Sequence, residues 1–160
     1  MAAAFRRFLS NVKAESFIHN KVVSVTAAVT ITRALHAGRT IKLDLAAGFA
    51  TTLPAATGTA ARYRFVIGTV ATGDHTIQIA DSTDVMAGGI LVNNSGDSAA
   101  ATADFYPTAA ASDTITLDAS EGAGKIGDWI ELEDVATNLW TVRGVFQGVA
   151  DPATPFSAAV

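Results

Sequence analysis

Cysteine is absent from this 160-residue chain, which excludes a disulfide framework and any thiolate site. Charged residues make up only 16% of the sequence and aromatic residues 8%, although 49% is hydrophobic. No apolar run approaches the ~18 residues needed to cross a bilayer, because Thr, Asp, Lys or Gly interrupts every candidate segment. We therefore expect one domain of ordinary size, no membrane contact, and a surface of Thr, Ser, Ala and Gly suited to lying against another protein.

The charged residues that are present are divided unevenly along the chain. Up to Phe65 there are nine basic residues and two acidic ones, whereas from Val66 onward there are two basic residues and thirteen acidic ones. Chance placement on solvated surfaces is one interpretation. The other is that a basic part is attracted to an acidic partner, or that copies pack basic part to acidic part. Nucleic acid is not an expected partner, because the chain is acidic overall and its bases are not clustered with stacking aromatics.

Residues 1–20 differ from the rest and are predicted to form an N-terminal arm. Three apolar side chains in the first nine residues follow the i, i+3, i+4 spacing of an amphipathic helix, but this stripe is too short to be stable alone. We expect it to anchor on a neighbouring protein, with a frayed terminus or, nominally, a transit peptide as alternatives. A secretory signal is not expected. The predicted partner contacts are Phe5, Arg6, Arg7, Phe8 and Leu9.

From Lys21 onward the pattern has a period of two, which is typical of half-buried strands. In one example, Ile41, Leu43 and Leu45 alternate with polar residues. Leu53 closes another strand, and Pro54 ends its capacity to pair. Similar patterns predict strands at 21–26, 28–33, 39–45, 61–67, 75–80, 89–93, 102–106, 113–118, 128–134 and 139–146.

Short strands at roughly ten-residue spacing, separated by Gly, Asp, Asn and Pro turns, predict an all-β fold. We expect an antiparallel β-sandwich or jelly roll over residues 21–148, because no crossover helices are visible. After Asn20 no window has a helical period of useful length. Residues 149–160 contain two prolines and no alternation, so they are predicted to be an extended tail on the surface.

Catalytic and metal-binding motifs are weak. His19, His36 and His75 have no carboxylate at ligand spacing, so surface or strand-end positions are expected for them. Asp81, Asp84 and Asp97 could bind calcium, but their spacing fits no calcium loop and favours ordinary turns. No nucleophile elbow is present. We therefore predict no enzyme activity, no cofactor, no metal site and no small-molecule substrate.

One strand carries the closest approach to a catalytic pattern. Glu131 and Glu133 share one face of this strand with Trp129, and Ile130 and Leu132 lie on the opposite face. Two residues along a strand separate the carboxylates by ~7 Å on an open face, which is a poor arrangement for glycoside cleavage. A solvated strand is favoured, or one that faces arginines across a sheet or subunit boundary. The possible inter-subunit polar face consists of Arg62, Arg64, Glu131 and Glu133.

Five strings of residues, spread over about the central two-thirds of the chain, join short strands by tight turns. They are Gly38–Gly48, Thr52–Gly58, Arg62–Gly68, Gly124–Leu132 and Asn138–Gly144. These strings resemble small structural proteins of tailed bacteriophages, above all head decoration (cement) proteins and also tail-fibre modules.

The resemblance implies a protein of the virion that lies on the capsid exterior. Decoration proteins of this kind typically form homotrimers and clamp neighbouring copies of the major capsid protein, often with extended terminal arms. The expected partners are therefore the major capsid protein and copies of the chain itself. A tail-fibre or baseplate module that binds a host receptor or glycan is the alternative, and a capsule-degrading enzyme is a third possibility.

Overall fold

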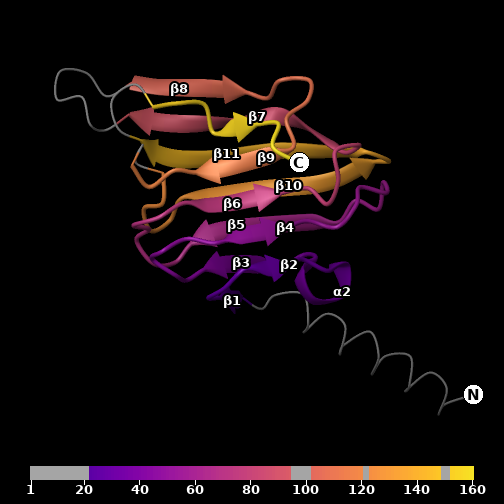
Figure 1. The fold of residues 1–160 in the computed structure, drawn as a ribbon, viewed down its shortest axis with the longest axis horizontal. Helices are drawn as coiled ribbons and strands as arrows, with labels where there is room; N and C mark the ends of the chain where they lie inside the picture. Colours follow the sequence, from indigo (N-terminus) through magenta and orange to yellow (C-terminus); the bar gives the residue numbers. More distant parts are fainter. Residues whose placement is uncertain (1–21, 95–101, 121–122, 149–151) are drawn as a thin grey trace, which may run out of the picture.

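The computed structural model describes residues 22–94, 102–120, 123–148 and 152–160. The described chain consists mostly of strands, with a single short helix, α2 (Arg33–His36), among the described residues. The strands form two sheets that lie one in front of the other in Figure 1. The expected all-β class is therefore confirmed. The helix α2 was not expected. No helix in these ranges is long and apolar enough to cross a membrane.

The larger sheet, sheet A, has seven strands. In spatial order they are β1 (Val23–Val25), β3 (Thr40–Leu43), β5 (Arg62–Ile67), β10 (Trp129–Ala136), β11 (Leu139–Gly148), β7 (Val85–Asn94) and β8 (Thr102–Pro107). Sheet B has five, in the order β12 (Phe156–Ser157), β9 (Thr114–Leu117), β6 (His75–Gln78), β4 (Ala50–Thr52) and β2 (Val29–Thr30).

The first six strands alternate between the two sheets. β1, β3 and β5 pair in parallel in sheet A, and β2, β4 and β6 pair in parallel in sheet B. Parallel neighbours need a crossover, and here each crossover contains a strand of the opposite sheet, with the four-residue α2 as the single helix among them. The chain thus coils through both layers from one end of the molecule, where Figure 1 shows β1, β2 and α2 together.

The later strands pair mainly antiparallel. β10 lies between β5 and β11, β7 pairs with β8, and β9 lies between β6 and β12, all antiparallel, whereas β11 and β7 form a parallel ladder of ten residue pairs. Both sheets are therefore mixed. The expected antiparallel sandwich or jelly roll is not confirmed, because a period-two pattern specifies which face is buried but carries no information on strand direction.

One hydrophobic core fills the space between the sheets and takes side chains from both. Trp140, Tyr63, Phe65 and Phe146 are its largest members, each no more than 1% exposed. Tyr63 and Trp140 pack ring against ring at 5.7 Å, which adds to the area they bury. Tyr63 belongs to β5, one of the first six strands, and Trp140 belongs to β11, one of the later strands. The core therefore joins the two groups of strands.

The C-terminal residues take part in the fold. Residues 152–160 are extended, as expected, but they are not confined to the surface: Phe156 is 7% exposed and belongs to β12, which pairs with β9. The Tyr106 hydroxyl donates to the Pro152 carbonyl at 2.5 Å, and the backbone N–H groups of Ala159 and Val160 donate to the Asp113 carboxylate. These bonds fix a segment that has no alternating pattern of its own.

Candidate functional site: the outer face of sheet A

The register of β5 and β10 brings the four residues of the predicted polar face together. Arg62 lies opposite Glu133, and Arg64 lies opposite Glu131. Because they alternate with side chains that are no more than 1% exposed, all four project from the outer face of sheet A. Their mutual contacts lie within one chain. A role of this face between subunits stays a prediction.

The ion pairs on this face differ from the register pairs. Arg62 binds both carboxylate oxygens of Glu133 at 3.1 Å, and this contact raises the pKa of the guanidinium. Glu131, however, is bound by Arg143 of β11. The Arg64 guanidinium lies 4.8 Å from the centre of the Trp129 ring. Arg143 was missed from the sequence, although it is the single base in its strand.

This arrangement bears on the acid and base chemistry that two carboxylates can support. Each glutamate is engaged in an ion pair with a guanidinium, Glu133 with Arg62 and Glu131 with Arg143. The Trp129 ring, which could stack on a sugar, has one side occupied by Arg64. The outer face of these strands is therefore a salt-bridged surface.

An apolar row crosses sheet A beside the charged residues. The strand registers align five outward-facing side chains across β8, β7, β11, β10 and β5. Two are strongly exposed for their size, Phe105 at 63% and Leu91 at 39%, and the other three are half-buried. Exposed aromatic and aliphatic side chains in a contiguous patch mark contact surfaces. The apolar row consists of Phe105, Leu91, Val145, Trp129 and Val66.

Two shallow hollows flank the ridge made by the glutamates. One, of about 220 Å³, lies on the β11 side and is lined by Glu133, Thr141 and Arg143 among others. The other, of about 200 Å³, lies on the β3 side, where Arg39 joins Arg62 and Arg64. We call the second the basic hollow. The two hollows have similar sizes and differ in charge.

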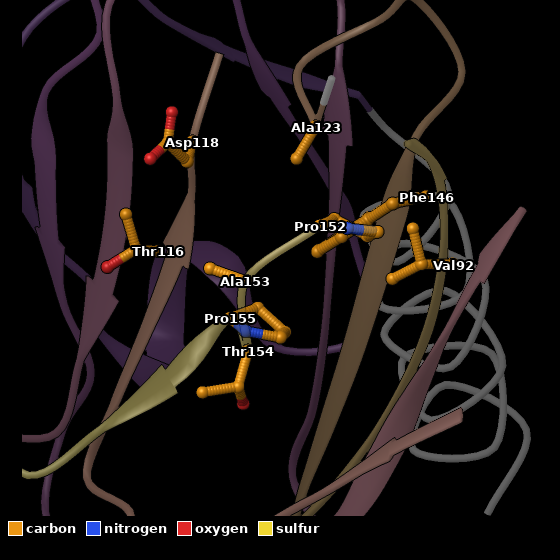
Figure 2. A pocket seen from close by; sticks show the side chains of 9 residues that line it. All are labelled: Val92, Thr116, Asp118, Ala123, Phe146, Pro152, Ala153, Thr154 and Pro155. Atoms are coloured by element: carbon orange, nitrogen blue, oxygen red, sulfur yellow. The ribbon is translucent and has the colours of Figure 1, made fainter. Parts of the chain in front are cut away.

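A small cavity lies between the sheets where the C-terminal segment crosses them. Figure 2 shows Pro152 and Pro155 beside Phe146 and Val92, with Asp118 at the opposite side. Its volume is about 70 Å³. Ligand pockets usually occupy roughly 300–1,000 Å³, so this cavity is too small to hold a substrate or cofactor of ordinary size.

Buried carboxylates account for several of the acidic residues. Asp134, 2% exposed, accepts hydrogen bonds from the backbone N–H groups of Thr57, Gly58 and Thr59 and from both threonine hydroxyls. Burial alone would raise the pKa of Asp134, but these bonds outweigh it and hold the pKa below its usual value. Asp84, 1% exposed, accepts from the Ala56 N–H at 2.6 Å. Both carboxylates hold one loop, residues 56–59.

Asp128, next to the start of β10, is a further buried carboxylate that binds backbone N–H groups. Its carboxylate accepts from the N–H groups of Gly124, Lys125 and Gln147. Here burial is the larger effect and raises the pKa of the carboxyl above its usual value. The predicted turn role of Asp81 also fits its hydrogen bonds to Thr83. In the part of the chain that the structure describes, no group of three or more His, Asp or Glu side chains could hold a metal ion.

The histidines correct one expectation from the sequence. His75 is the first residue of β6 but is 0% exposed, and it packs edge-on against Phe49 at 4.6 Å between ring centres. Its burial lowers the pKa of the imidazole. His36 is 6% exposed and its Nδ1 accepts from the Thr32 N–H at 3.0 Å. The expected strand-end position is confirmed for His75, although its ring is buried, whereas the expectation is wrong for His36, which lies buried on α2. An imidazole can pack as an aromatic ring.

The remaining predicted residues lie outside the described ranges. This applies to His19, to Asp97 and to the five predicted arm contacts, Phe5, Arg6, Arg7, Phe8 and Leu9. Comparisons of the chain with models of protein families, with curated proteins and with solved structures gave no match. Functional inference therefore depends on the outer face of sheet A and on the sequence resemblance.

Proposed function

We propose that the chain is a bacteriophage head decoration protein that binds the outside of the assembled capsid and stabilises the shell without catalysis. The observation that carries the proposal is the outer face of sheet A, where the apolar row lies beside a salt-bridged polar face. Contact surfaces of this kind combine apolar anchors with charged groups that fix orientation. The resemblance of the strand and turn strings to decoration proteins supplies the biological setting.

Stabilisation would operate by mass action. A protomer that binds only the assembled shell lowers the free energy of that state and leaves the free subunits unaffected. Many copies, each with more than one contact, slow dissociation further. The mechanism requires no bound cofactor and no reacting group, and its partners are the major capsid protein and copies of this chain.

The size of the face indicates that it does not act alone. Seven strands ~4.8 Å apart and three rows of side chains cover roughly 500 Å², whereas stable interfaces bury about 800 Å² on each partner. A second contact is needed, and the proposed N-terminal arm or self-association as a homotrimer would supply it. Phe5, Phe8 and Leu9 are the arm residues expected to anchor.

The test uses heads of the parent phage that lack this protein. We expect the full chain to cosediment with expanded heads, and a chain without residues 1–20, or with Phe105→Glu, to bind at least tenfold more weakly. Leu35→Glu is the matched control, because Leu35 is 59% exposed but lies on α2, outside sheet A. If the full chain binds heads and neither the truncation nor Phe105→Glu weakens that binding, the assigned surfaces are wrong. Binding to tails or host glycans instead of heads would support the fibre or baseplate alternative.

A further inference from the structure

The basic hollow contains cations that have no carboxylate partner on the sheet. Its lining brings Arg39, Arg62 and Arg64 together from β5 and the residue before β3, with Glu131 of β10 as its one carboxylate. Arg62 is held by Glu133, but no carboxylate of the described residues lies within 4.0 Å of Arg39 or Arg64. Glu131, the register partner of Arg64, is already bound by Arg143. Two guanidinium groups are therefore available at one place.

The charge of the surrounding face is opposite to that of the whole chain. Five cations and three carboxylates lie at least partly exposed on or beside β3, β5, β10 and β11, because the carboxylates of Asp128 and Asp134 are buried. This gives a local surface excess of positive charge, whereas the chain has a formal net charge of −4. Such a local excess attracts a small acidic group at short range, while the net charge repels a long polyanion. The cations are Arg39, Lys42, Arg62, Arg64 and Arg143, and the carboxylates are Asp44, Glu131 and Glu133.

The positions of these arginines are well defined by the sheet. Arg62 and Arg64 alternate with the fully buried Tyr63 and Phe65, and Arg64 also rests on the Trp129 ring. A guanidinium held by packing loses less conformational freedom when it forms a two-bond contact with a carboxylate. The adjoining apolar row adds a surface for the aliphatic part of a bound segment.

We propose that the basic hollow binds carboxylate side chains of an acidic protein segment on the partner, with Arg39 and Arg64 as the binding groups. This inference rests on the proposed function and adds the chemistry of the partner to it. The bound carboxylate pairs with Arg39 and Arg64, while Glu131 stays paired with Arg143. Because the Arg64 guanidinium rests on the Trp129 ring, a carboxylate bound to it changes the charge beside the ring, so the indole reports binding.

The first experiment uses the full chain and a capped hexaglutamate peptide as probe. We expect binding by calorimetry, accompanied by a change in Trp129 fluorescence, since Trp140 is 0% exposed and insensitive to the surface. Affinity should fall about tenfold when Arg39→Ala and Arg64→Ala are combined, and less than twofold for Lys125→Ala, which removes a cation outside the hollow. Equal affinities for the double variant and the control would overturn the inference.

Two further arms separate the alternatives. A single-stranded oligonucleotide of equal charge should bind more weakly than the peptide, and tighter binding that is lost in the double variant would assign the hollow to nucleic acid and overturn the proposal. In the head assay, undiminished binding of the double variant would overturn the hollow but leave the decoration function standing. If the chain binds the peptide but does not bind heads, the hollow is supported and the decoration function is overturned.

Discussion

The strands before and after residue 80 build the same two sheets in different ways. In the coiled region, β1–β6, each strand pairs in parallel with the strand two positions along the chain. In the later region, β7–β12, pairing is mainly antiparallel and the turns are tied by buried aspartates. Among the described residues, the coiled region carries most of the bases, and the later region most of the acids.

Many of the charges in the two regions differ in where they lie: several acids are buried, and several bases are on the surface. Asp84, Asp113, Asp128 and Asp134 are each no more than 5% exposed, and their carboxylates bind backbone N–H groups. These four carboxylates of the later region are therefore buried, and they contribute little to the negative charge of the surface. Five of the bases, by contrast, lie on or beside the outer face of sheet A, which makes them the better candidates for contact with a partner: Arg39, Lys42, Arg62, Arg64 and Arg143.

The largest expected effect comes from removing the carboxylate that joins the two regions. Asp134→Ala leaves five donors of the 57–59 loop without their acceptor, and we expect a loss of about 3 kcal/mol in the free energy of unfolding, measured by urea denaturation. Asp81→Ala is the control, because Asp81 is exposed and its carboxylate bonds only within its own turn, to Thr83 and Asp84. If both changes lowered the free energy of unfolding equally, the buried Asp134 carboxylate would contribute no more to stability than the exposed Asp81 carboxylate.

The next effect tests the ladder that joins β7 to β11. Gly88 has φ of 141°, and a Cβ there would lie 2.0 Å from the Val142 carbonyl oxygen, so Gly88→Ala should cost about 2 kcal/mol. Gly127→Ala is the matched change: φ is also positive, at 98°, but nothing lies within 4 Å of the added carbon. Thermal melting should show a clearly smaller loss for Gly127→Ala, and the reverse order would contradict the close approach of these strands.

A pH titration examines the buried imidazole of the coiled region. Burial lowers the pKa of His75 in the folded state, so the unfolded chain takes up its proton first, near pH 6.5. Stability should therefore fall as the pH is lowered from 7.5 through 6.5, by at most about 1.4 kcal/mol per pH unit for one proton.

His75→Leu provides the comparison for this titration. The variant should have a flatter dependence of unfolding free energy on pH between 7.5 and 5.5, whatever its stability at neutral pH. Parallel curves for the two proteins would mean that His75 is protonated as readily in the fold as in the unfolded chain.

The smallest effect is expected on the polar face. Arg62 and Glu133 are an exposed pair, with 60% and 26% of the side chains accessible, and pairs of this kind contribute little to stability. A double-mutant cycle with Arg62→Ala and Glu133→Ala should leave the melting temperature nearly unchanged. A large coupling between them would assign the pair a role in folding, and weaken the argument that the face is free for a partner.

The sequence predicted the strands better than their arrangement. Each of the ten predicted segments overlaps a strand, and the alternation around Ile130 and Leu132 correctly placed Glu131 and Glu133 outside. The helix α2 and the strand β12 were missed, because four and two residues are too few to show a period. Strand direction and the pairing of Glu131 with Arg143 depend on which strands become neighbours, and local patterns do not record that.

The parallel ladder between β7 and β11 has a consequence for the speed of folding. It joins residues 54 apart, such as Val85 and Leu139, whereas β1 and β3 join residues 18 apart, such as Val23 and Ile41. Closing the longer loop costs about 1 kcal/mol more in chain entropy. We therefore expect the coiled strands to assemble early and the ladder to form in the rate-limiting step, which makes mutations along β11 the ones that slow refolding.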